Sequence, residues 1–191
     1  MFTEEKNKEI YSEYIEIPSD VKISIEGNKI IAEGKLGKTS KEIKHVALNK
    51  IIFMKIEDNK FIVYSLKRRK EYKAMVNTII AHVKNLIEGV TKGYKYTMKI
   101  VYSHFPIKIE IKEGKVFIHN FLGERTPRIA EIVGNTKIEV KENYLIVSGN
   151  NIEEVGQTCN NIEQACRITV WDRRVFQDGI FLIKRENLIE S

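Results

Sequence analysis

The sequence contains no run of about 18 apolar residues, so it offers no candidate for a transmembrane helix. Its first residues, MFTEEKNKEIYSEY, are charged and lack the apolar region of a signal peptide. We therefore expect neither a membrane anchor nor a cleaved leader, and we expect residues 1–13 to be peripheral.

Cysteine is also scarce, because only Cys159 and Cys166 are present among 191 residues. Six residues separate them, which is unlike the CxxC spacing of zinc and redox motifs. On a helix over residues 152–168 they would lie about two turns, or roughly 10 Å, apart, which is too far for a disulfide. Both are predicted to be small, buried, apolar side chains.

The common catalytic motifs are missing as well. The sequence has no P-loop, no glycine pattern of dinucleotide-binding folds, and no zinc-protease or serine-hydrolase motif. None of the four histidines stands at a metal-ligand spacing from another histidine or a cysteine. We therefore predict that the protein is not an enzyme and holds no metal.

Positive charge is present in excess, and it is concentrated in one part of the chain. The formal net charge is +6. Residues 67–115 carry 12 basic and 4 acidic residues, whereas residues 1–66 are neutral and residues 116–191 carry a net charge of −2. A local basic block indicates a polyanionic partner, most often nucleic acid. A solvated helix face is the alternative, and composition does not decide between the two.

The chain contains an internal repeat. Residues 22–43, KISIEGNKIIAEGKLGKTSKEI, align without a gap with residues 108–129, KIEIKEGKVFIHNFLGERTPRI, at an offset of 86. Identical pairs include Ile23/Ile109, Leu36/Leu122 and Gly37/Gly123. Two copies of this length indicate a duplicated domain rather than a solenoid.

Each copy is predicted to hold several antiparallel strands followed by one helix. Alternating apolar and polar residues predict a hairpin at 21–33 and its counterpart at 107–119. Apolar residues at helical spacing predict helices at 68–88, ended by Gly89, and at 152–168.

The second helix has a candidate N-cap in Asn151, and the tail after Arg167 has no counterpart in the first copy. A sheet needs its apolar face covered, and in each copy the helix supplies the cover. The predicted fold class is therefore α+β, with two tandem duplicated domains, 1–90 and 91–191. Each is predicted to be an antiparallel sheet covered by one helix.

Four segments stand in one order along the chain: NLIEGVTKGYKYTMKIVYSHFPI at 85–107, NFLGERTPR at 120–128, VGQTCNNIEQACRI at 155–168 and DRRVFQDGI at 172–180. Together they resemble the universal large-subunit ribosomal protein six family, in its archaeal and eukaryotic branch. The likeness extends from about Tyr14 to the end of the chain.

The resemblance implies a cytoplasmic protein of the ribosome, with no catalytic activity and no cofactor. It implies binding to large-subunit ribosomal RNA, mainly through the second domain and tail. The family lies near the sarcin–ricin loop at the base of the stalk, where translation factors dock. Neighbouring large-subunit proteins would be its other partners.

The first candidates for RNA contact are Arg125 and Arg128, in the loop that carries the NFLGE part of the resemblance. Gly123 permits an unusual backbone there and a close approach to phosphate. RNA helices are recognised largely by shape and phosphate position, which favours arginine and loop backbone over a base code. The alternative is a β-turn with exposed charges.

Two further sets follow the helix ends. The second set lies past the second helix, beside Trp171 and Phe176, and arginine next to aromatic residues suits phosphate contact and stacking. Its members are Arg167, Arg173, Arg174 and Gln177. The third set stands where the first copy ends, and it consists of Lys92, Tyr94 and Lys95. The alternatives are that the aromatics belong to the core and that the third set faces the other domain.

Two other hypotheses remain open at this point. A free-standing RNA-binding module would have affinity for short RNAs without the ribosome. A plain interaction protein that uses its sheet edges would show little salt dependence of binding. The most basic tetrapeptide, Lys67–Lys70, fits either an RNA contact or a solvated helix start.

Overall fold

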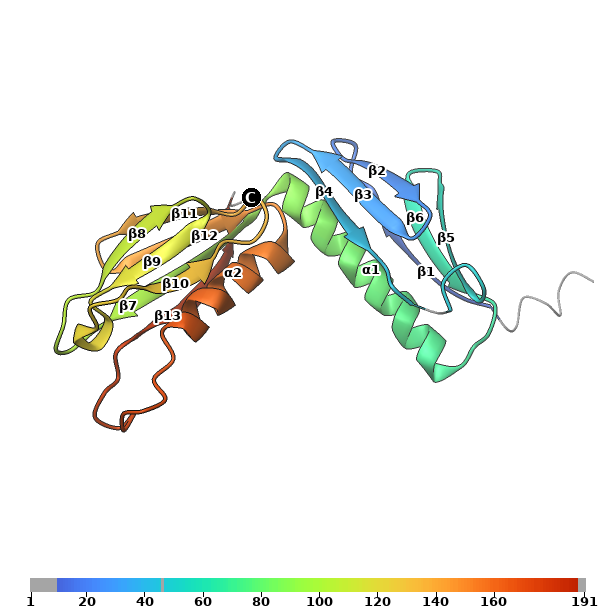
Figure 1. Cartoon of the computed structure of the whole chain (residues 1–191). Helices are drawn as coiled ribbons and strands as arrows, with labels where there is room; N and C mark the ends of the chain where they lie inside the picture. The colour runs from blue at the N-terminus through green and yellow to red at the C-terminus, as the bar shows by residue number, and fades with distance from the viewer. Residues whose placement is uncertain (1–9, 46, 189–191) are drawn as a thin grey trace, which may run out of the picture. The chain divides into compact units, whose positions relative to one another are not determined.

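A computed structural model describes residues 10–45 and 47–188. The chain forms two compact units, one that ends at Thr91 and one that starts at Lys92 (Figure 1). No helix among the described residues is long and apolar enough to cross a membrane.

Between residues 10 and 91, leaving aside Val46, the structure shows six strands of the first unit in two antiparallel sheets. One sheet has the order β1-β6-β5, and the other has the order β2-β3-β4. The strands are β1 (Tyr11–Glu16), β2 (Lys22–Glu26), β3 (Lys29–Gly34), β4 (Gly37–Glu42), β5 (Ile52–Glu57) and β6 (Lys60–Ser65). The predicted hairpin is confirmed, with Ile25 paired to Ile30 across its turn.

Helix α1 (Lys70–Thr91) packs on both sheets of this unit. Its buried residues recur at three- and four-residue steps, as the sequence predicts for one apolar face. Gly89, predicted to end the helix, instead lies buried inside it, because the apolar stripe continues to Val90. The left-handed residue after the helix is Gly93, with a φ of 68°.

The second unit repeats this architecture and adds one strand. Its sheets have the orders β10-β9-β8 and β11-β12-β7-β13. The elements are β7 (Tyr94–Val101), β8 (Lys108–Lys112), β9 (Lys115–His119), β10 (Arg128–Glu131), β11 (Lys137–Lys141), β12 (Tyr144–Gly149), α2 (Ile152–Ala165) and β13 (Gly179–Asn187). Asn151 caps α2 as predicted, because its side chain accepts a hydrogen bond from the Glu153 amide at 3.0 Å.

The two units share one strand order. The three-stranded sheet β2-β3-β4 corresponds to β8-β9-β10, and β1-β6-β5 corresponds to β7-β12-β11. In both units a single helix follows the sixth strand. The predicted duplicated α+β fold is therefore confirmed, with two small sheets in each unit where one was expected. The tail supplies β13, which pairs antiparallel with β7.

Two further expectations have clear outcomes. Residues 1–9 and Val46 lie outside the described residues, but residues 11–13 belong to β1 rather than to a peripheral segment, because they pair with β6. Cys159 and Cys166 are free and buried in the core of the second unit, as predicted. Burial raises the pKa of each thiol to about 12, which disfavours the reactive thiolate.

Candidate nucleic-acid interface

The loop between β9 and β10 has an unusual backbone. A short 3-10 helix, Phe121–Gly123, opens it, and Asn120, Leu122 and Gly123 all have positive φ angles. Gly123, at a φ of 77°, takes the conformation predicted for it. A side chain at this position would press on the Phe105 ring, because a Cβ added to Gly123 would lie 3.2 Å from it.

Arg128 closes this loop from within the second unit. Its guanidinium forms a two-pronged ion pair with the Glu124 carboxylate at 2.8 and 2.6 Å. The same group donates to the carbonyl oxygens of Ala165 and Arg167 at 2.9 and 3.0 Å, at the end of α2. It also lies 4.3 Å from the centre of the Phe121 ring. Its hydrogen bonds within the chain therefore give Arg128 a structural task.

The charges of this pair shift each other's pKa. The hydrogen bond from Arg128 lowers the pKa of the Glu124 carboxyl, and the hydrogen bond to Glu124 raises the pKa of Arg128. Arg125 differs from Arg128, because its side chain is exposed and no ion pair is seen for it in the part of the chain that the structure describes. Of the two predicted loop arginines, Arg125 is thus the one that is exposed to solvent.

The tail after α2 forms one wall of a cleft of about 630 Å³. The opposite walls come from the last residues of α2 and from the start of β13. Three of the four predicted tail residues line it: Arg167, Arg173 and Gln177. The structure therefore brings together residues that are up to ten positions apart in the sequence.

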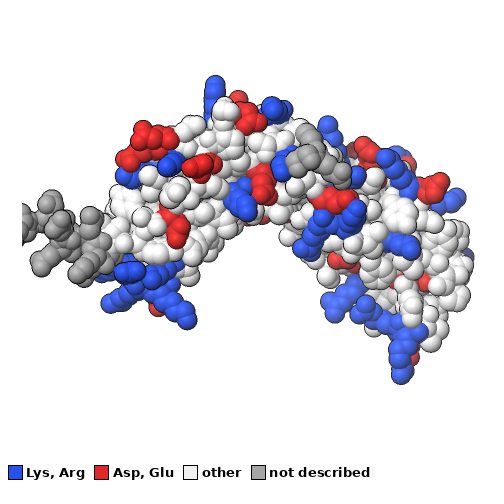
Figure 2. All heavy atoms as spheres, turned by 180° about the vertical axis from the view of Figure 1, so that it is seen from behind, with Lys and Arg blue, Asp and Glu red and all other residues white. Residues whose placement is uncertain are grey.

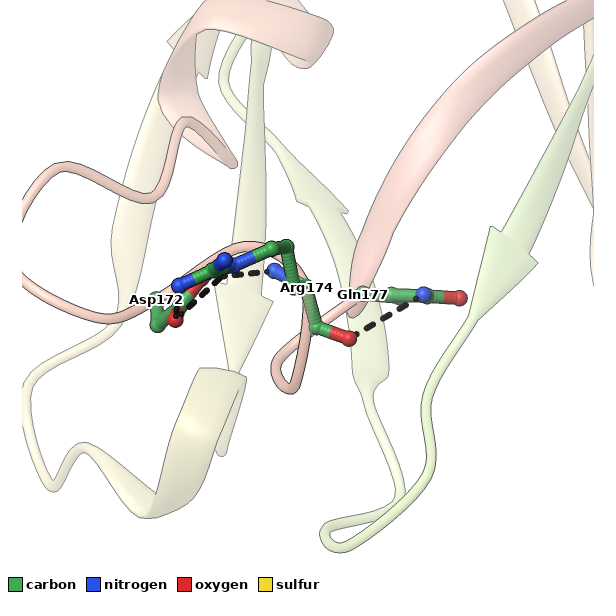
Figure 3. A network of polar contacts seen from close by, with 3 residues as sticks. All are labelled: Asp172, Arg174 and Gln177. Carbon is green, nitrogen blue, oxygen red and sulfur yellow. Dashed lines mark hydrogen bonds and ion pairs between the residues drawn. The ribbon is translucent and has the colours of Figure 1, made fainter.

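Arg174 is the predicted tail residue that points elsewhere. Its guanidinium binds the Asp172 carboxylate, with Nη2 at 2.8 Å from Oδ2, and its backbone amide donates to the same side chain at 3.0 Å (Figure 3). The hydrogen bonds from Arg174 lower the pKa of Asp172. Because the Arg174 side chain is 90% exposed, this pair contributes little to stability, but it neutralises the charge locally.

The two aromatic residues of the tail take different positions. Phe176 is half-buried and packs against the core of the second unit, whereas Trp171 is 56% exposed. Their ring centres lie 5.0 Å apart, so Phe176 supports the exposed indole. Of the two interpretations, Phe176 belongs to the core edge and Trp171 is available for stacking.

Comparison with known proteins decides the family. A family model described as Ribosomal protein L6 matches residues 17–93 and 105–179, which is most of the chain. This chain belongs to the ribosomal protein L6 family. The resemblance seen in the sequence is therefore confirmed.

Three relatives show how far the similarity to this L6-family chain extends, and each is described as large ribosomal subunit protein uL6. That of Methanothrix thermoacetophila is 45% identical over 171 residues, covering 90% of this chain and 95% of the relative. That of Sulfurisphaera tokodaii is 44% identical over 174 residues, covering 91% and 92%. That of Ignicoccus hospitalis is 42% identical over 173 residues, covering 90% and 93%.

The third predicted set of this L6-family chain does not form a surface as a whole. Tyr94 begins β7 and is only 5% exposed within the core, so its ring is not presented to a partner. The alternation of β7 explains this position, because it places Tyr94, Tyr96 and Met98 on one buried face. Lys92 and Lys95 are partly exposed.

The basic tetrapeptide Lys67–Lys70 is fully on the surface. All four side chains are exposed where α1 begins, and Figure 2 shows Lys and Arg side chains gathered there. Cations are unfavourable at the positive end of a helix, so this start is not optimised for stability.

Asp178 lies at the candidate site, although the sequence analysis did not select it. It lines the same cleft as Arg167 and Arg173, and it is 2% exposed. An Asp-Gly pair indicates a turn in a sequence, and nothing in the sequence pattern marks this carboxylate as buried. Only the packing of the tail against β13 and α2 reveals it.

Proposed function

We propose that this chain is a structural constituent of the large ribosomal subunit and binds large-subunit rRNA through its second domain. Family membership supports the ribosomal role. The observation that carries the RNA site is the cleft of the second unit, where Arg167, Arg173 and Gln177 converge. The exposed Arg125 and Trp171 extend that surface.

In this proposal the domains are 1–90 and 91–191, and the second carries the binding tail. Arg125, Arg167 and Arg173 provide phosphate contacts, and Gln177 provides a neutral hydrogen-bonding group. Arg174 and Arg128 contribute mainly by holding the tail and the loop in shape. Lys92 and Lys95 are secondary contacts, and Gly123 lets the loop turn.

Family membership also supports a proposal for the place of the chain in the ribosome. We propose a position near the sarcin–ricin loop at the base of the stalk, in the cytoplasm. There the chain supports subunit assembly and the docking of translation factors, beside neighbouring large-subunit proteins.

Sedimentation of a cell extract tests the ribosomal role. The chain should co-migrate with large subunits and remain with them in moderate salt. RNA crosslinks should fall in residues 120–128 and 167–174. A chain that sediments free of large subunits at low salt would contradict the proposal, and crosslinks confined to the first unit would contradict the placement of the site.

A further inference from the structure

Asp178 has an unsatisfied hydrogen-bonding group in the tail cleft. Among the described residues it is the only buried side chain of the aspartate, glutamate, lysine, arginine and histidine types, at 2% exposure. Its Oδ1 accepts a hydrogen bond from the Ser103 amide at 3.2 Å. Its Oδ2 is buried and has no partner in the described part of the chain. A buried carboxylate oxygen without a donor is unfavourable, so the site is complete only when a donor arrives.

The surroundings of Asp178 restrict the kind of donor. Arg167 and Arg173 line the same cleft and repel a cation, which makes a metal ion or an amine a poor partner. The two arginines instead favour an anionic group. The other carboxylate of the cleft, Glu163, already accepts from the Leu182 amide at 2.9 Å. A fitting ligand therefore combines a neutral hydrogen-bond donor with a negative charge.

A nucleotide has this combination, and the cleft has room for one. Its volume of about 630 Å³ lies within the range of small-ligand sites, which is about 300–1,000 Å³. Phe176 and Phe181 line it and offer aromatic surface to a base. The terminal torsion of aspartate is broad, so a modest rotation turns a carboxylate oxygen toward an incoming base.

We propose that the cleft accepts one unstacked guanine of an RNA strand, with the base donating to the Asp178 carboxylate. Guanine carries two adjacent donors on its Watson–Crick edge, N1–H and N2–H, which match a carboxylate. Uracil carries one donor flanked by two carbonyl oxygens, which a carboxylate repels. This inference rests on the proposed RNA-binding function and adds a base preference to it.

The test uses the full chain and its own tryptophan. Trp171 is the only tryptophan in the sequence and lies beside Phe176, so its fluorescence reports on the cleft. We expect a uridine hexanucleotide with one central guanosine to bind at least about fivefold more tightly than hexauridine, the low end for a good base pairing by a side chain. Replacing the guanosine by inosine, which lacks the N2 amine, should remove part of this gain.

The matched variants are Asp178→Asn and Asp172→Asn. In Asp178→Asn the amide oxygen keeps the Ser103 hydrogen bond, and the new NH2 group faces the guanine donors, so the ratio between the affinities for the guanosine-containing oligonucleotide and for hexauridine should fall to about one. Asp172 is half-exposed and does not line the cleft, so Asp172→Asn should keep the preference.

Three results would overturn the guanine site. These are equal binding of the two oligonucleotides by the wild-type chain, no binding of either, and a preserved preference in folded Asp178→Asn. If Asp178→Asn does not fold, the inosine comparison on the wild-type chain decides, because binding of the inosine oligonucleotide as tight as that of the guanosine oligonucleotide would overturn the two-donor contact. Each of these results leaves co-sedimentation with large subunits unaffected, whereas loss of that co-sedimentation would count against the proposed function itself.

Discussion

The two units have the same strand order, but the carbonyl groups at the C-terminal ends of their helices accept hydrogen bonds from different donors. In the first unit a two-residue turn, Lys35-Leu36, joins β3 to β4, and the Leu36 amide donates to the Val90 carbonyl at 3.0 Å. In the second unit the loop is longer, and the Arg128 side chain donates to the carbonyls of Ala165 and Arg167. The contact between the strand connection and the helix end is thus made by the backbone in the first unit and by a side chain in the second.

The difference shows how a duplicated fold can gain a binding loop. A backbone contact requires a tight turn, and Gly34 is packed so closely that an added Cβ would lie 2.9 Å from the Val90 side chain. A long arginine side chain spans a larger gap, so the loop of the second unit can be longer and present Arg125 outward. The helix end remains satisfied in both cases.

The N-terminal ends of the two helices also differ. Helix α2 begins with the Asn151 cap and with Glu153 and Glu154 in its first turn, all favourable at a helix N-terminus. Helix α1 begins at Lys70, directly after Lys67, Arg68 and Arg69, and Glu71 is the only acid of its first turn. The second unit thus has the start built for stability, and the first has a start that stability alone does not favour.

Removing β13 should have the largest effect, because it removes the strand that only the second unit has. β13 covers one edge of β7 and contributes Ile180, which is 1% exposed. A chain ending at Asp178 should lose about 4 kcal/mol or more from the stability of the second unit. Hydrogen exchange should show faster exchange in β7 and α2, with β3 and β6 of the first unit unchanged. Unchanged exchange in β7 would show that β13 is dispensable.

Arg128→Ala should cause the second-largest loss of stability, because it removes the side chain that binds the carbonyl groups at the end of α2. The variant loses charge-assisted hydrogen bonds to two carbonyls and to Glu124, and we expect a cost of about 2–3 kcal/mol in unfolding free energy. Denaturant unfolding measures it, with Arg125→Ala as the control of equal size. An equal effect of both variants would contradict the structural task of Arg128.

The same ion pair predicts a pH dependence. The pKa of Glu124 in the folded state is lowered below its usual value of 4.5. The ionised carboxylate therefore contributes to folding stability above about pH 4.5, and this contribution is lost as the pH falls through the lower folded-state pKa. The wild-type advantage over Glu124→Gln should therefore shrink below about pH 4.5. An advantage that grows on acidification would contradict the pairing.

Gly34→Ala tests the backbone closure of the first unit. The added methyl group would press on the Val90 side chain and on its carbonyl oxygen, at 2.9 and 3.0 Å. We expect a loss of about 1–2 kcal/mol. Gly156→Ala is the control, because nothing lies within 4 Å of its built Cβ in α2, and it should stabilise by about 0.5–1 kcal/mol. A loss of stability in Gly34→Ala together with a gain in Gly156→Ala would support the close packing of Gly34 on Val90. A gain in both variants would contradict it.

The helix starts predict the smallest effects. Asn151→Ala should cost about 1 kcal/mol, because it removes a working cap. Arg69→Asp should stabilise the first unit by about 0.5 kcal/mol, because it places an acid before the first residue of α1. Thermal unfolding of the two variants compares them directly. A destabilising Arg69→Asp would show that the basic start has a structural role.

The sequence predicted the repeated parts of the fold well. The 22–43 and 108–129 alignment gave the duplication because strand periodicity and turn glycines are local signals. It did not predict β13, because an added edge strand needs a partner that lies some 80 residues away, in β7. The prediction that α1 ends at Gly89 was wrong, because the burial of Val90 outweighs the usual tendency of glycine to end a helix.

The candidate site was predicted only in part, because some of its contacts depend on long-range packing that the sequence does not show. Arginines in loops were visible in the sequence, and three tail residues do meet around one cleft. Their partners within the chain were not visible, because the carbonyls that hold Arg128 come from the end of α2 and the Asp172 carboxylate that binds Arg174 belongs to the tail itself. A sequence does not show which backbone carbonyls accept hydrogen bonds from side chains. Only the fold therefore distinguishes an arginine that is exposed to solvent from one that binds within the chain.

The most direct test of the account compares two charge reversals of equal size. Arg173→Glu/Arg174→Glu changes the tail of the second unit, and Lys67→Glu/Arg68→Glu changes the basic start of the first. All four side chains are exposed, so circular dichroism should show a normal fold for both variants. We predict that the tail reversal strongly reduces incorporation into large subunits and gives a shallower salt dependence of residual rRNA binding, because fewer counterions are released. The reversal in the first unit should incorporate nearly as the wild type does. Equal loss in both would show that net charge, and not the second unit, carries the binding.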